Sequence, residues 1–157
     1  MADFLTDDDI ERLIAEPKPI PDDFLVTIHQ YRQKAGHHES DVELDGADGS
    51  VFQIRVRQSV FNRLDFSVIL LVETKTGWFR LRRYNGLSHE HTNRLERDRF
   101  RGYHVHYATE RYQRLGADED AFAEPTDRYA DVQSALECMA SDCHLVGSLG
   151  GTRRLPF

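Results

Sequence analysis

Hydrophobic and polar residues alternate along the middle of the chain with the period of β-strands. Residues 51–57 (VFQIRVR) and 103–109 (YHVHYAT) are apolar at every second position, so each segment has one apolar and one polar face. Residues 66–72 (FSVILLV) are apolar except for Ser67, which is typical of a central strand. Residues 78–84 (WFRLRRY) follow a turn, and residues 41–44 precede one. The pattern predicts an antiparallel sheet of about five strands.

Apolar residues recur with helical spacing near both ends of the chain. Residues 6–16 (TDDDIERLIAE) have one apolar stripe, and Thr6 or Asp7 is a suitable N-cap. Pro17 and two further prolines end this helix and predict an extended connector. Residues 131–143 show the same spacing. We therefore expect an N-terminal and a C-terminal helix.

The order of these elements indicates the α+β class, with both helices packed on one face of the sheet. A chain of 157 residues has the usual length of one domain, so residues 1–157 are predicted to form a single domain. Residues 22–36 are ambiguous, and residues 110–128 are polar and predicted to be irregular. The predicted parts are a helix and proline connector at 1–21, a β-rich core at 41–109 and a helix at 130–145.

The net charge of -7 is unevenly distributed. Residues 1–50 carry 4 basic and 13 acidic residues, residues 51–115 carry 13 and 6, and residues 116–157 carry 3 and 8. A cationic middle between anionic ends favours an anionic partner such as RNA. The alternative is intramolecular, with the acidic ends packed on the basic centre.

Other classes of protein lack support in the sequence. No apolar run approaches the ~18 residues of a membrane helix, and the N-terminus does not have the pattern of a secretory signal. The two cysteines, Cys138 and Cys143, do not make a disulfide framework. These features predict a cytoplasmic protein without membrane contact.

The predicted strands place many polar side chains on the face of the sheet opposite the helices. This open face depends on the strand register, because a slip of one residue would reverse it. The expected residues are Gln53, Arg55, Arg57, Arg80, Arg82, His104 and His106.

Four of the eight histidines form two His-x-His pairs, His89/His91 and His104/His106. In a strand, such a spacing puts both imidazoles on one face. Paired imidazoles suit acid–base chemistry near neutral pH, or binding of a divalent transition metal. Both alternatives stay open from the sequence.

Cleavage of RNA without a metal needs a base, an acid and cations at the phosphate. The middle of the chain supplies these residue types, which predicts an endoribonuclease without a cofactor. We expect His104 and His106 to be the acid and base, with His91 close by. The expected substrate-binding residues are Arg55, Arg57, Arg80, Arg82, Arg83, Tyr84 and Asn85.

The string FRLRRYNGLSHEHTN followed by YHVHYATERYQ resembles a family of short bacterial proteins of the DUF type. More distantly it is similar to the TumE-type toxins of toxin–antitoxin pairs. The resemblance covers roughly residues 66–143 and implies a bacterial protein of a mobile element or defence system, with nuclease activity and an antitoxin as partner.

Two other functions fit the same residues. The chain could be a non-catalytic module that binds nucleic acid or another protein through the basic face. It could also be a metal-dependent hydrolase that uses His89, His91, His104 and His106. The oligomeric state is not predicted by any feature of the sequence.

Overall fold

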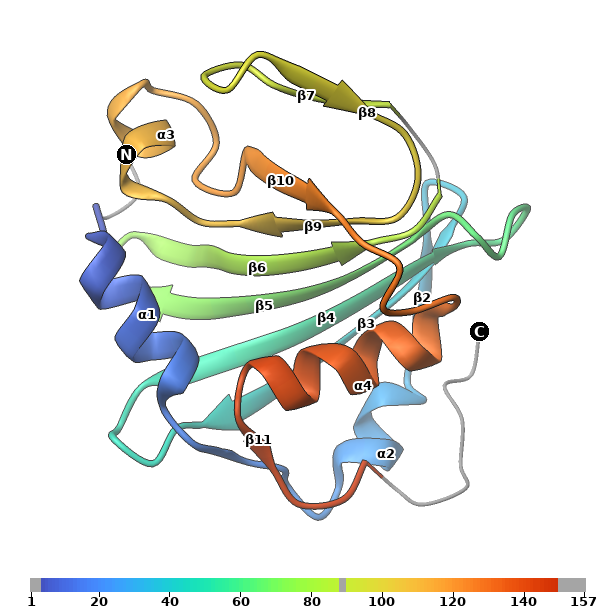
Figure 1. The fold of residues 1–157 in the computed structure, drawn as a ribbon. Coiled ribbons are helices and arrows are strands. Elements are labelled where there is room, and N and C mark those ends of the chain that lie inside the picture. Colours follow the sequence, from blue (N-terminus) through green and yellow to red (C-terminus); the bar gives the residue numbers. More distant parts are fainter. Residues whose placement is uncertain (1–3, 88–89, 150–157) are drawn as a thin grey trace.

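The fold is mixed α+β, as seen in a computed structural model that describes residues 4–87 and 90–149 (Figure 1). Within these ranges the largest sheet has seven antiparallel strands, in the order β10-β9-β6-β5-β4-β3-β2. These strands are β2 (Arg32–Lys34), β3 (His37–Asp45), β4 (Val51–Ser59), β5 (Phe66–Thr74), β6 (Gly77–Asn85), β9 (His104–Tyr107) and β10 (Phe122–Pro125).

The described residues also form two smaller sheets and four helices. A hairpin joins β7 (His91–Asn93) to β8 (Asp98–Phe100), and β1 (Lys18–Pro19) pairs in parallel with β11 (Leu145–Val146). The helices are α1 (Asp7–Ala15), α2 (Phe24–Ile28), α3 (Glu110–Arg114) and α4 (Val132–Asp142). None of the helices described is long and apolar enough to cross a membrane.

The core lies between one face of the seven-stranded sheet and the helices α1, α2 and α4. Figure 1 shows α4 across the strands and α1 at the end of the sheet where β5 turns into β6. Phe52, Ile54 and Val56 of β4 are fully buried, which confirms the predicted apolar face of this strand. Leu13 of α1 and Leu136 of α4 belong to the same core cluster, so both predicted terminal helices contribute to it.

The sheet has more strands than the sequence pattern predicts. The two additional strands are at its edges, β2 within the ambiguous residues 22–36 and β10 within residues 110–128, which were expected to be irregular. Every residue of β2 is exposed and polar, so no apolar alternation marks it. Backbone pairing with one neighbour is enough to extend a sheet, and such edge strands leave little signal in the sequence.

A register shift in β6 gives some of its side chains the opposite orientation to the one predicted. Leu70 pairs with Arg82 and Leu71 pairs with Arg80, so one residue of β6 is extra at this point. Such a bulge reverses the alternation beyond it. Arg82 therefore points to the core side, where its guanidinium lies 4.8 Å from the Tyr107 ring centroid. The prediction that Arg82 lies on the open face was wrong.

Tyr84 is on the core side for the same reason. Its side chain is fully buried, and its hydroxyl donates a hydrogen bond to Asp142 Oδ2 at 2.7 Å. Burial raises the pKa of this phenol above its ordinary value. Tyr84 thus packs beneath α4 and does not face the surface where a substrate would bind.

Lys18 joins the C-terminal ends of two helices. Its side chain is completely buried, and Nζ lies 2.7–3.0 Å from the carbonyl oxygens of Leu13, Ile14, Glu16 and Cys143. These carbonyls end α1 and α4, where helices lack internal donors and favour a cation. Burial lowers the pKa of Lys18 to about 8, so the ammonium stays charged at neutral pH.

Candidate metal centre

Three histidines meet on the open face of the sheet. His104 and His106 are on β9, and His91 comes from the β7–β8 hairpin, which lies beside β10 (Figure 1). The ring centroid of His91 is 5.5 Å from that of His104 and 4.8 Å from that of His106, and the latter two are 5.0 Å apart. One ring nitrogen from each residue lies within 4.8 Å of the others.

Hydrogen bonds fix the tautomers of the two histidines on β9. His104 Nδ1 lies 2.8 Å from the Gly102 carbonyl, and His106 Nδ1 lies 2.7 Å from the Asp120 carbonyl. Because a carbonyl oxygen only accepts, each Nδ1 carries the proton. In the neutral ring the lone pair is then on Nε2. Partners of this kind orient histidine ligands in metal sites.

Asn93 fixes His91 and also attaches the hairpin to the sheet. Its amide donates to the Ala123 carbonyl at 2.7 Å, and its Oδ1 accepts from the Ala123 backbone N–H at 2.9 Å. Asn93 Oδ1 also lies 2.8 Å from His91 Nε2, which must therefore be the donor. The lone pair of His91 is then on Nδ1. Since Ala123 pairs with His106 in the sheet, Asn93 brings the third histidine to the other two.

His104 and His106 are shielded from solvent, with exposed fractions of 3% and 5%. Burial, together with the charge of Arg83 and the neighbouring His104, lowers the pKa of His106 to about 2. His106 is therefore neutral at physiological pH. A neutral imidazole offers a lone pair, as a metal ligand must, but it holds no second proton to donate as a general acid.

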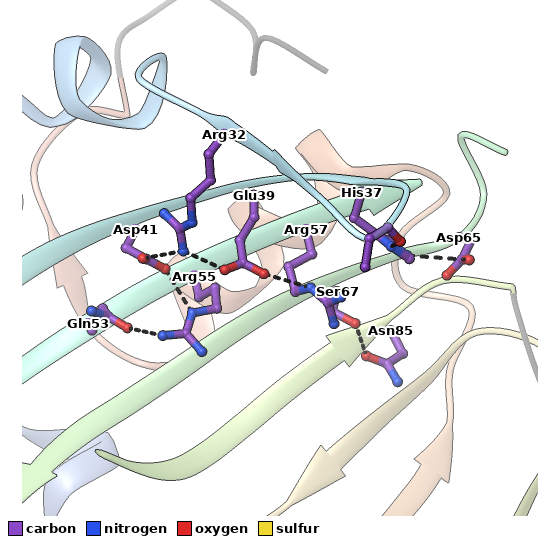
Figure 2. Close-up of polar contacts among 11 residues, drawn as sticks. Arg32, His37, Glu39, Asp41, Gln53, Arg55, Arg57, Asp65, Ser67 and Asn85 are labelled. Atoms are coloured by element: carbon purple, nitrogen blue, oxygen red, sulfur yellow. Dashed lines mark hydrogen bonds and ion pairs between the residues drawn. The ribbon is translucent and has the colours of Figure 1, made fainter. Parts of the chain in front are cut away.

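The arginines of the open face are paired with carboxylates of the acidic ends of the chain. Arg55 Nε contacts Asp41 at 2.8 Å, and Arg57 Nε contacts Glu39 at 2.9 Å. Figure 2 shows that Arg32 on β2 joins the same network and reaches both carboxylates. These contacts support the intramolecular interpretation of the charge distribution.

A second ion-pair network lies beside the histidines. Arg80 contacts Glu119 at 2.9 Å and Asp120 at 3.5 Å, and Arg83 Nε contacts Asp120 at 3.1 Å. Asp120 is completely buried, and burial raises the pKa of its carboxyl group against the opposing effect of Arg83 and Arg80. Its carboxylate offsets part of the positive charge that Arg83 places next to His106.

The structure brings together four of the residues that the sequence singled out. His91, His104 and His106 converge, and Asn85 joins them through a 3.5 Å contact between its Nδ2 and His104 Nε2. His89 lies outside the described residues. Arg55, Arg57, Arg80 and Arg83 are on the open face, whereas Arg82 and Tyr84 are not.

Two residues of the site escaped the sequence analysis. Asn93 follows His91 at a spacing of two, so the His-x-Asn alternation could have identified it as a neighbour on one strand face. Asp120 is part of an acidic run and has no spacing that distinguishes it. Only the fold shows that its backbone carbonyl meets His106 and its carboxylate meets Arg83.

No family model, curated protein or solved structure matches the chain. The resemblance to the DUF-type proteins and the TumE-type toxins therefore stays a prediction.

Proposed function

We propose that the chain binds one divalent transition metal ion, with Zn²⁺ as the best-suited candidate, through His91, His104 and His106, and that it is a metal-dependent hydrolase. The observation that carries the proposal is the convergence of three imidazoles, each of which has one ring nitrogen held by a hydrogen bond. Three protein ligands leave a coordination position for water, as in catalytic zinc sites.

The distances support a site that closes on the ion. With bonds of about 2.0–2.1 Å, tetrahedral Zn²⁺ holds its ligand nitrogens about 3.3 Å apart. The three ring nitrogens lie within 4.8 Å of one another. The three nitrogens would have to approach one another by up to about 1.5 Å when the ion binds.

A bound zinc ion would supply Lewis acidity and lower the pKa of a coordinated water molecule. The residues of this chain would hold the ion, keep the three rings oriented and limit the access of bulk solvent. Asn85 Nδ2 lies 3.5 Å from His104 Nε2, so this amide would have to move away from that nitrogen when the ion binds there.

The proposal predicts hydrolysis that depends on the metal. Zinc-loaded protein should hydrolyse at least one of p-nitrophenyl acetate, p-nitrophenyl phosphate and bis(p-nitrophenyl) phosphate. Excess EDTA should remove the activity, and added Zn²⁺ should restore it. His104→Ala should be inactive, whereas His29→Ala, which changes an exposed histidine, should match the wild type.

The same assay separates this proposal from the endoribonuclease predicted by the sequence. Single-stranded RNA is included as a substrate, in the presence and absence of EDTA. Cleavage that persists in EDTA and is lost in His104→Ala would contradict the metal-dependent mechanism and favour the metal-independent one. Salt-sensitive binding of intact RNA without cleavage would favour a binding module.

A further inference from the structure

A polar cavity of about 260 Å³ lies on the open face, and one of its lining residues, Asn85, contacts His104. Arg57, Ser67, Arg83 and Asn85 line it from three neighbouring strands, and His37 and Asp65 close one side. Figure 2 shows the cluster: Arg57 contacts Glu39, Ser67 contacts Asn85, and His37 points to Asp65. Polar contacts thus hold several of the side chains at the cavity wall.

The strand register connects this cavity to the histidines. Arg57 pairs with Ser67, Ser67 with Asn85, and Asn85 with His104, so the four residues form one row across β4, β5, β6 and β9. Side chains directly opposite each other lie on the same face of a sheet. At about 4.8 Å per strand, the row spans roughly 14 Å. The amide of Asn85 lines the cavity and also contacts the His104 ring.

Arg83 gives a second connection between the cavity and the metal centre. It lines the cavity and is the direct partner of His106 across β6 and β9. Its Nε contacts Asp120, and Arg57 Nε contacts Glu39. Because a guanidinium has five N–H donors, a carboxylate at Nε leaves donors for a ligand. Two arginines with such donors form a site that suits an oxyanion.

We infer that this cavity binds the oxyanion group of a small substrate, a phosphate or a carboxylate, between Arg57 and Arg83, and presents the adjacent bond to the metal centre. The statement that the metal centre acts on this adjacent bond rests on the proposed function. The volume is below the ~300–1,000 Å³ of sites for drug-sized ligands, so the cavity fits one anionic group with its immediate substituent. The substrate class is therefore a small anionic ester or amide.

Binding of inorganic phosphate and of acetate to metal-free protein in EDTA tests the cavity by itself. Isothermal titration should give a 1:1 complex for at least one of the two anions, and the stronger of them identifies the preferred oxyanion. Arg57→Gln and Arg83→Gln should each weaken that binding at least tenfold. Arg12→Gln is the control, because Arg12 is exposed on α1, is paired with Asp9 and does not line the cavity. Its affinity should be unchanged.

The outcomes separate this inference from the proposed function. Arg57→Gln should still bind Zn²⁺ with wild-type affinity, because it leaves the three histidines intact. If the wild type does not bind Zn²⁺ but does bind the anion, the result contradicts the proposed metal centre and leaves the inference about the cavity intact. Absence of anion binding, or equal weakening by Arg12→Gln and Arg57→Gln, would overturn the inference. If Arg83→Gln does not fold because Asp120 loses a partner, Arg57→Gln and His37→Ala carry the test, since both change residues at the cavity wall.

Discussion

His106→Ala is expected to lower the affinity for Zn²⁺ by more than about a hundredfold, because it removes a ligand and not merely a supporting residue. Asn93→Ala should lower it by about 10–100-fold, the range for residues that orient ligands. This variant removes the acceptor for His91 and the two hydrogen bonds to Ala123. His106→Ala is therefore predicted to weaken Zn²⁺ binding more than Asn93→Ala does.

Competition with a chromogenic zinc chelator measures both affinities. His29→Ala serves as the control, since His29 is exposed and outside the cluster. Thermal unfolding of the metal-free variants shows whether each remains folded. Wild-type affinity in His106→Ala would exclude the three-histidine site. A larger loss in Asn93→Ala than in His106→Ala would indicate that position of the hairpin, rather than the ligand set, determines binding.

Lys18→Met is expected to lower the free energy of unfolding by about 3 kcal/mol, because it leaves several buried carbonyls without a donor. The four acceptors belong to the ends of α1 and α4, so the substitution weakens both helix ends at once. Methionine keeps the length of the unbranched apolar part of the side chain, which separates the loss of the ammonium group from the loss of packing. Lys18→Arg should also destabilise, since a guanidinium is larger than an ammonium and the four carbonyls of this buried site lie 2.7–3.0 Å from Nζ.

Urea unfolding monitored by circular dichroism measures this effect. Lys34→Met is the matched control, because Lys34 is exposed on the edge strand β2. Its unfolding midpoint should stay close to that of the wild type. A change of less than about 1 kcal/mol in Lys18→Met would contradict the role assigned to the ammonium, since that is the usual net value of one ordinary hydrogen bond.

The central strands and terminal helices follow from local sequence patterns. β4 is buried at alternate positions over most of its length and β5 is buried almost throughout. Buried positions need apolar residues, so both patterns can be read from the sequence. Thr6 caps α1 as expected, in a capping box with Asp9. Edge strands β2 and β10 depend on backbone pairing and carry no comparable pattern.

The candidate site was only partly accessible to sequence reasoning. The shared face of His104 and His106 follows from the His-x-His spacing in a strand. The approach of His91 depends on the bonds between Asn93 and Ala123, which are 30 residues apart. The position of Arg82 depends on the bulge opposite Leu70 and Leu71, and alternation alone cannot reveal a single inserted residue.

The charge counts located the basic and acidic segments of the chain but did not identify what the basic segment binds. The basic centre and acidic ends identified by residue counts meet as ion pairs, such as Arg57 with Glu39 and Arg83 with Asp120. Much of the positive charge of the open face is therefore balanced within the chain. The cavity between Arg57 and Arg83 is small, which favours a small anionic ligand over a long polyanion.

Zinc stoichiometry is the most direct test of the metal centre. Metal-free protein is dialysed against micromolar Zn²⁺ and then against metal-free buffer, and zinc per chain is measured by elemental analysis. We predict one zinc ion per chain in the wild type and in His29→Ala, and less than a tenth of that in His104→Ala. A wild-type protein that retains no zinc, or a His104→Ala variant that retains the full amount, would contradict the three-histidine centre.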